Sequence, residues 1–315
     1  MKIFLTGASG CIGHYIADVL MRETEHELFL FLRNPDKLKL DLKYRPGVTL
    51  LQGDMGEIGQ YQSLLETINV AILTAAAWGG EEETYTINVT KTIETINLLS
   101  PTVCQQVIYF STASILTQDN QLLPEAKDLG TDYIRTKYQC CKKLEELTQK
   151  CKITTVFPTL VFGGDENKPY SHLSGGLPDT IKWMNLVRWF QAEGSFHFIH
   201  ARDIATVVRH LIDNPPLGNK LILGNEPLTA NQAIEQICSY LGKQIYFRFP
   251  LSQWLANIFI ELFRIQVAPW DRYCMNHPHF TYHNYVNPAT FGYKPYCATI
   301  TDLLQITGIP QSARE

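Results

Sequence analysis

The sequence of 315 residues has no surplus of positive charge. Its 27 lysines and arginines are outnumbered by 31 aspartates and glutamates, so the formal net charge is -4 and the isoelectric point is near 6.1. Nucleic acids and anionic membranes are bound by clustered basic side chains, and this composition supplies no such field. We therefore expect a small-molecule substrate and no nucleic-acid partner.

Metal-binding and disulfide patterns are also missing. The eight cysteines include no C-x-x-C pair, and Cys140 and Cys141 are neighbours in a predicted helix, so neither a zinc framework nor a disulfide scaffold is indicated. The histidines at 277, 279 and 283 do not predict a metal site, because a proline between the first two breaks helical spacing and no acidic residue is near in the sequence. We predict reduced thiols, a cytoplasmic protein and no metal site.

Long hydrophobic runs are absent as well. The most apolar stretch, residues 254–265, is about half of the roughly 20 residues that a membrane span requires, and it contains Asn257, Glu261 and Arg264. It predicts an amphipathic helix packed on a substrate-binding lobe, with peripheral docking to a membrane as the alternative. An apolar strand at the start of the chain leads at once into glycines, so no cleavable signal peptide is expected.

Short apolar runs alternate with longer helical patterns through the first half of the chain. The runs lie at residues 3–6, 28–32, 48–52, 70–75, 107–110 and 154–158. Strands joined by helical crossovers form a parallel sheet with helices on both faces. The predicted fold class is α/β, a Rossmann-type doubly wound parallel sheet.

The texture of the sequence changes after Phe162. A stretch rich in glycine, proline and aromatic residues is followed by shorter strand patterns at 196–200 and 220–223. We place a smaller C-terminal substrate lobe there. The predicted division is a dinucleotide-binding Rossmann domain at 1–160 and a mainly substrate-binding lobe at 161–315, with some segments returning to the Rossmann sheet.

A glycine-rich turn joins the first strand to a predicted helix that covers residues 14–21. Its T-G-x-x-G-x-x-G pattern starts at Thr6. The first glycine permits the tight turn, the second lets the backbone approach a pyrophosphate and the third lets helix and strand pack closely, while the helix N-terminus offers free N–H groups. Predicted cofactor contacts in this turn are Gly7, Ser9, Gly10, Cys11, Ile12 and Gly13.

The tip of the second strand bears on the choice between NAD and NADP. NAD enzymes usually carry an acidic residue there, whereas this chain carries Arg33. A guanidinium pairs well with the 2′-phosphate of NADP, so NADP is predicted with NAD less favoured; the alternative is a solvated loop arginine. After the third and fourth strands, a possible acceptor for the adenine amine and a floor of small residues add the predicted contacts Asp54, Met55, Ala75, Ala76 and Ala77.

Tyr133 and Lys137 stand four residues apart, which places them on one face of a helix. A phenol titrates near pH 10, so a neighbouring ammonium is needed to favour the phenolate at neutral pH. The Y-x-x-x-K pattern is common by itself. Here the fifth strand ends at Ser111 and Thr112 about twenty residues earlier.

The order of these motifs resembles the extended short-chain dehydrogenase/reductase superfamily, in its NAD-dependent epimerase/dehydratase branch. Segments F-P-T-L-V-F-G at 157–163 and F-I-H-A-R-D-I-A at 198–205 match the same pattern, so the resemblance covers nearly the whole chain. It implies that Thr112 hydrogen-bonds the reacting oxygen, that Tyr133 transfers its proton, and that Lys137 binds the nicotinamide ribose and lowers the tyrosine pKa.

The resemblance has three further implications. Asn88 is similar to a family asparagine that steadies the site, although a helix cap explains it equally well. The helix that carries Tyr133 continues in an apolar stripe through Cys140, Cys141, Leu144 and Leu147, and relatives use this helix to form a homodimer, which we expect here. Further cofactor contacts fall on Tyr133, Lys137, Pro158, Leu160 and Val161.

Departures from the family pattern narrow the expected chemistry. Ala113 and Ser114 replace the Asp-Glu pair of dehydratases, which disfavours elimination, and Phe157 and Phe196 replace residues that hold a substrate diphosphate. We predict NADP(H)-dependent reduction or oxidation of a small carbonyl or alcohol substrate. The alternatives are an NAD-dependent sugar or nucleotide-sugar epimerase, and a non-enzymatic NADPH-binding regulatory protein.

Overall fold

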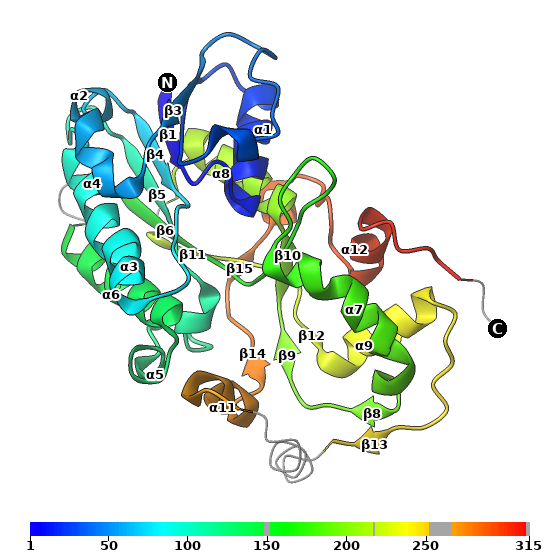
Figure 1. The fold of residues 1–315 in the computed structure, drawn as a ribbon. Helices are drawn as coiled ribbons and strands as arrows, with labels where there is room; N and C mark the ends of the chain where they lie inside the picture. The colour runs from blue at the N-terminus through cyan, green and yellow to red at the C-terminus, as the bar shows by residue number, and fades with distance from the viewer. Residues whose placement is uncertain (148–151, 217, 252–265, 313–315) are drawn as a thin grey trace.

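The computed structural model describes residues 1–147, 152–216, 218–251 and 266–312 (Figure 1). At its centre is a sheet of eight strands in the order β15-β11-β6-β5-β4-β1-β2-β3, and every neighbouring pair is parallel. The strands are β1 (Lys2–Thr6), β2 (Glu27–Leu32), β3 (Val48–Gln52), β4 (Val70–Leu73), β5 (Gln106–Phe110), β6 (Ile153–Pro158), β11 (Lys220–Leu223) and β15 (Tyr285–Val286). The predicted doubly wound parallel sheet is confirmed.

Alternate residues of the central strands feed two separate cores, one on each face of the sheet. In β1, Phe4 belongs to one core while Ile3 and Leu5 belong to the other. One face is covered by α1 (Cys11–Glu23) and α8 (Ala201–Asp213), and the opposite face by α3 (Glu81–Tyr85), η3 (Thr86–Lys91), α4 (Thr92–Leu98) and α6 (Asp132–Leu147) (Figure 1). Shorter elements at the edges are α2 (Gln62–Leu65), α5 (Pro124–Asp128), η1 (Pro35–Lys37), η2 (Met55–Tyr61) and η4 (Ala113–Ile115).

A third core lies among helices from the second half of the chain. It is built by α7 (His172–Val187), α9 (Ala230–Tyr240) and α12 (Ile300–Ile306), which gather on the right of Figure 1. Three small sheets, α11 (Pro269–Asn276) and η5 (Pro288–Phe291) complete the fold. The small sheets pair β10 (Phe198–His200) with β7 (Leu160–Phe162), β13 (Phe249–Pro250) with β8 (Phe190–Gln191), and β9 (Ser195–Phe196) with both β12 (Leu228–Thr229) and β14 (His279–Phe280).

Two strand predictions in this half need correction. The strand expected at 196–200 is divided at His197, whose buried ring has Nδ1 2.7 Å from the Asn225 carbonyl oxygen and accepts a 3.0 Å hydrogen bond at Nε2 from the Tyr282 N–H. The strand expected in the substrate lobe at 220–223 instead pairs with β6 in the large sheet. The domain division at residue 160 stays a prediction.

Asp203 in α8 binds the C-terminal segment around Tyr296 and Cys297 to this helix. Its buried carboxylate accepts hydrogen bonds from the backbone N–H groups of Tyr296 and Cys297 at 2.6 and 3.0 Å. Burial nevertheless raises the pKa of this carboxyl to about 6. Asp203, the aspartate of the F-I-H-A-R-D-I-A segment, therefore links α8 to the chain around Tyr296.

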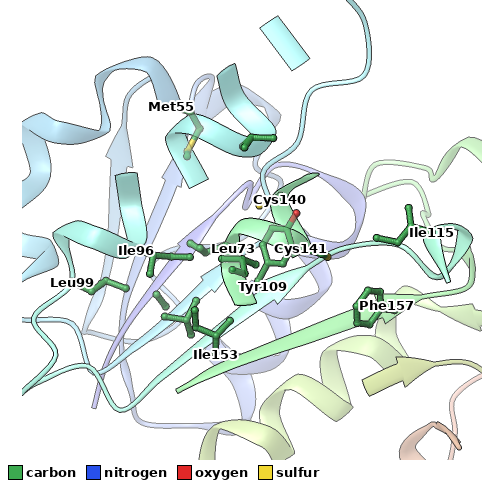
Figure 2. Close-up of a cluster of buried hydrophobic side chains, with 14 of the residues drawn as sticks. Met55, Leu73, Ile96, Leu99, Tyr109, Ile115, Cys140, Cys141, Ile153 and Phe157 are labelled. Carbon is green, nitrogen blue, oxygen red and sulfur yellow. The ribbon is translucent and has the colours of Figure 1, made fainter. Parts of the chain in front are cut away.

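The apolar stripe of α6 is covered within one chain. Cys140, Cys141 and Leu144 are buried, and they belong to the same core as Tyr109 (Figure 2). The stripe thus has a partner in the sheet, and by itself it does not indicate a second copy of the protein. The helix predicted at 254–265 lies outside the described residues.

The searches for special sites apply to the same part of the chain. Within the described ranges, no helix combines the length and hydrophobicity needed to cross a membrane, and no group of three or more His, Cys, Asp and Glu side chains is arranged to hold a metal ion. His279 Nδ1 lies 2.9 Å from the Ser195 hydroxyl, and His283 faces Asp119 at 3.7 Å. Six of the described cysteines are free thiols, namely Cys11, Cys140, Cys141, Cys238, Cys274 and Cys297.

Candidate active site

The ends of β1 and β4 meet at the centre of the sheet, where the strand order reverses. The Thr74 hydroxyl donates to the Thr6 carbonyl oxygen at 2.6 Å, and the Ala75 N–H donates to the Thr6 hydroxyl at 3.2 Å. These bonds end β4 at Leu73, two residues earlier than predicted, and turn Ala75 toward the glycine-rich loop. Crevices at such reversal points are where doubly wound folds bind nucleotides.

Two of the three glycines in the loop are required by close packing. Gly7 has a φ of +70°, and a Cβ there would lie 2.8 Å from the Ala75 nitrogen. A Cβ on Gly13 would lie 2.2 Å from the Gly7 carbonyl oxygen, which is far inside van der Waals contact. Glycine is therefore needed at both positions for helix, loop and β4 to approach one another.

The third glycine leaves an open approach to the backbone. Gly10 is exposed, and a Cβ there would meet only the Gly7 carbonyl oxygen, at 3.3 Å. No side chain of the described residues caps the helix that begins at Cys11. Its first N–H groups are thus available to an anion, and the loop fits a dinucleotide pyrophosphate.

The glycine loop supports a matched pair of substitutions. We expect Gly13→Ala to lower the free energy of unfolding by about 2–4 kcal/mol, because its Cβ overlaps backbone that cannot move away independently. Gly10→Ala should leave the melting temperature within a degree or two yet weaken NADPH binding at least tenfold, because its methyl group occupies the open approach. Thermal melts and calorimetric titration of both variants test this; equal stability of the two variants would contradict it.

The other predicted contacts of this loop line the same region. Cys11 Sγ lies close to Gly163, and burial raises the pKa of its thiol to about 12, so the thiol is protonated at neutral pH. Ile12 packs against the α1 core, and Ser9 is half-buried. Pro158, the last residue of β6, is buried. In β7, Leu160 is exposed and Val161 packs on the α1 core.

Arg33 and Asp54 face each other beyond the tips of β2 and β3. Arg33 Nη1 lies 3.8 Å from Asp54 Oδ2, and the arginine side chain is 74% exposed. The other carboxylate oxygen of Asp54 accepts a 2.8 Å hydrogen bond from the Gly56 N–H. The Met55 side chain is buried in the core (Figure 2), so its predicted cofactor contact is restricted to its main chain.

The predicted catalytic pair lies at the start of α6, against the end of β5. Lys137 is 2% exposed, and its Nζ donates a 2.7 Å hydrogen bond to the carbonyl oxygen of Phe110, directly before Ser111 and Thr112. The same ammonium lies 4.9 Å from the centroid of the Tyr109 ring and 5.8 Å from that of Tyr133. The structure thus brings Y-x-x-x-K to the S-T segment.

The pKa values at this pair differ from the sequence prediction. Burial lowers the pKa of Lys137 to about 8, and burial raises the pKa of the Tyr133 phenol. The expected lowering of the phenol pKa by Lys137 is reversed in this structure. The reason is that the ammonium is held on the Phe110 carbonyl while the low-dielectric surroundings disfavour the phenolate.

Thr112 follows β5 and begins the short helix η4. Its hydroxyl lies 3.4 Å from both the backbone nitrogen and the hydroxyl of Ser114, contacts that are at the long end of hydrogen bonding. The side chain is half-buried. It is therefore placed at the carboxyl end of the sheet, and among the described residues its hydroxyl has only these two long contacts.

Asn88 is not a helix cap, because it lies in the middle of η3. Its Nδ2 donates to the Ala77 carbonyl oxygen at 3.0 Å and to the Thr136 hydroxyl at 3.1 Å, and its Oδ1 accepts from the Ala77 N–H at 2.8 Å. One buried amide thus ties the predicted cofactor floor to the helix that carries Tyr133 and Lys137. Asn88 positions both segments.

Sequence reasoning overlooked Trp78. Its indole lies parallel to the Tyr133 ring, with centroids 3.8 Å apart and planes 7° apart. The same indole meets His172 of α7 edge to face at 5.1 Å. An aromatic residue directly after the small-residue floor, followed by Gly79 and Gly80, is the signal in the sequence that could have indicated it.

The family model described as the NAD dependent epimerase/dehydratase family matches residues 3–224. The chain belongs to this family. Membership makes it an enzyme of the short-chain dehydrogenase/reductase type with a nicotinamide cofactor, as the motifs predicted.

Individual curated relatives match only part of the chain, and the solved structures that resemble it have low sequence identity. Isoflavone reductase homologues of Nicotiana tabacum and Nicotiana sylvestris are 33% identical over 99 residues, so the match spans 30% of this chain and 31% of theirs. The crystal structure of gox2253 is similar with a TM-score of 0.70 and 18% identity, over 98% of this chain and 99% of that chain. UDP-glucuronic acid 4-epimerase of Bacillus cereus, solved with NAD, gives 0.66 and 16% over 96% of each chain. These two structural likenesses show the fold.

Proposed function

We propose that the protein reduces a small carbonyl compound, or oxidises the corresponding alcohol, with NADP(H) at a site formed by Thr112, Tyr133 and Lys137. The observation that carries the proposal is the 2.7 Å hydrogen bond from Lys137 to the carbonyl oxygen of Phe110, which holds the Y-x-x-x-K helix against the S-T segment at the end of β5. The bound nicotinamide would supply or accept the hydride.

The raised pKa of Tyr133 supports the reductive direction. A phenol that stays protonated at neutral pH can donate its proton to a carbonyl oxygen as that oxygen gains negative charge. No protein hydrogen bond to the Tyr133 hydroxyl is found among the described residues, so the hydroxyl is free to meet a substrate. Thr112 would donate a hydrogen bond from its hydroxyl to the same oxygen, without giving up its proton.

The residues at the diphosphate-binding positions support an uncharged substrate. Phe157 is fully buried in the core of the large sheet, and Phe196 packs against the core of α7 and α9. Neither offers a cation to a phosphate. Ala113 and Ser114 supply no acid and base for eliminating water, so a dehydratase reaction is not proposed.

The preference for NADP is tested at Arg33. We expect Arg33→Ala to weaken NADPH binding about tenfold and to leave NADH binding unchanged, because only NADPH presents the 2′-phosphate to the guanidinium. Lys37→Ala, in the same exposed loop, is the matched control and should affect NADPH less. Calorimetric titration of the wild type and both variants with NADPH and NADH gives six affinities; an equal loss for both cofactors in Arg33→Ala would contradict the assignment.

An epimerase is the second candidate. It is favoured by Asp54, whose carboxylate already lies 3.8 Å from Arg33 and would compete with a 2′-phosphate, and by solved relatives of the fold that hold NAD. An epimerase returns its hydride to the substrate. It would retain tightly bound NAD through purification and show no net change in nicotinamide absorbance during turnover.

Two other features are carried forward as proposals. A homodimer is proposed on the family resemblance alone, because the α6 stripe is covered within one chain. A cytoplasmic location is proposed from the free thiols and from the composition.

A further inference from the structure

The indole of Trp78 is an exposed ring contact at the candidate site. The residue is 59% exposed, although one face of its ring lies flat on Tyr133. Single apolar side chains at the surface are common, but an exposed aromatic ring stacked on a reacting group is a feature of ligand-binding walls. The contact therefore calls for an explanation beyond core packing.

The backbone around Trp78 is anchored on one side and open on the other. Ala77 is held at both its N–H and its carbonyl by Asn88. Gly79 and Gly80 follow, each with open space around the position of a Cβ, and Gly80 has a φ of +78°. The indole can therefore shift without disturbing the predicted cofactor floor.

Trp78 also joins the two halves of the site. Its edge-to-face contact with His172 reaches from the loop after β4 to the first turn of α7. The Tyr133 ring, the Trp78 indole and the His172 imidazole together form an aromatic wall. The wall supplies flat, polarizable surfaces.

We propose that Trp78 determines substrate specificity by selecting a carbonyl compound that carries a planar, unsaturated or aromatic ring. The incoming ring takes the place of the phenol against the indole, so that Trp78 covers the ring while the Tyr133 hydroxyl meets the carbonyl oxygen. A planar ring regains the stacking contact that the indole gives up. A puckered saturated ring of the same size cannot do so.

This inference rests on the proposed reductase function and is tested with two matched aldehydes. Benzaldehyde and cyclohexanecarbaldehyde have the same carbon skeleton but differ in planarity. We expect the wild-type protein with NADPH to favour benzaldehyde by about tenfold in kcat/KM. Trp78→Ala should raise the KM for benzaldehyde threefold to tenfold, the effect of losing one aromatic pair, and should leave kcat and the KM for the saturated aldehyde nearly unchanged.

Two further variants separate stacking from a general loss of structure. Trp78→Phe keeps a flat ring and should retain most of the preference. Trp183→Ala removes a comparably exposed indole that lies about three turns after His172 on α7. It should leave kcat and KM unchanged for both aldehydes. The inference is overturned if the wild type shows no preference for benzaldehyde, or if the preference survives in Trp78→Ala. Continued turnover in either case leaves the reductase function standing.

A binding measurement covers the case in which neither aldehyde is reduced. Benzaldehyde should quench part of the tryptophan fluorescence of the wild type, and this part should be missing in Trp78→Ala but present in Trp183→Ala. Such quenching without turnover would support the aromatic site and count against the reductase function. Absence of both turnover and quenching would count against both.

Discussion

Replacing Tyr133 with phenylalanine is expected to lower kcat by about 10²–10⁴-fold, the usual contribution of a positioned general acid. The change deletes one oxygen atom, and that hydroxyl has no protein hydrogen bond to lose within the described part of the chain. The fold and NADPH affinity should therefore be maintained, and the stacking on Trp78 should persist because the ring remains. The measurement is NADPH consumption with a carbonyl compound that the wild type reduces.

Tyr138→Phe provides the control, since Tyr138 lies on the same helix and packs against the core without any predicted role in catalysis. It should retain near wild-type turnover. Undiminished activity of Tyr133→Phe would remove the proposed mechanism. If the purified Tyr133→Phe protein lost turnover but still fully supported the protein's role in cells, the result would favour the regulatory, non-enzymatic alternative.

Replacing Lys137 with methionine is expected to abolish measurable turnover and yet stabilise the cofactor-free protein. The ammonium is 2% exposed and is satisfied by a single carbonyl, so its charge is costly to bury. Methionine has a similar length and fills the same space. We expect a gain of about 1–2 kcal/mol in the free energy of unfolding at pH 7, reduced from the full cost of the charge because the Phe110 carbonyl loses its partner.

The pH dependence of that gain follows from the lowered pKa of Lys137. The folded protein releases the proton near pH 8, whereas the unfolded chain holds it until its ordinary pKa near 10.5. Between these values the unfolded state binds more protons, so the wild type becomes more stable as pH rises. The advantage of Lys137→Met should thus be complete below pH 8 and decline above it.

Lys143→Met is the matched control for this experiment. Lys143 is exposed on the same helix, where its Nζ contacts the Tyr85 hydroxyl at 3.0 Å. It should change stability by less than about 0.5 kcal/mol at any pH. Denaturant unfolding at pH 7, 8 and 9.5 distinguishes the cases; a destabilised Lys137→Met protein at pH 7 would show that the buried ammonium contributes net stability.

Much of the fold was predictable because its signals are local. Strands such as β2 read as continuous apolar runs, which is the mark of a strand buried on both faces of a parallel sheet. The spacing of Gly7 and Gly13 within one strand-turn-helix unit is readable from the sequence, although the contacts that require glycine at Gly7 come from Thr74 and Ala75 after β4. The spacing of Tyr133 and Lys137 is set by the helix itself, so their common face follows from residue numbers alone.

What the sequence could not decide was which distant segments become neighbours. β11 and β15 are short strands that return to the large sheet from the second half of the chain, and their partners are chosen by packing. His197 breaks a predicted strand because two remote backbone groups bind its ring. Asn88 joins Ala77 to Thr136 for the same kind of reason, since a buried amide takes its partners from whatever the fold brings near.

The site divides along the same line. Sequence by itself determined the family, the dinucleotide loop and the candidate Thr112, Tyr133 and Lys137 set, because each depends on residue type and short spacing. Only the tertiary structure placed Lys137 on the end of β5, reversed the expected direction of the Tyr133 pKa and put Trp78 against the phenol. Burial, desolvation and ring stacking arise between segments far apart in the chain, and no local pattern encodes them.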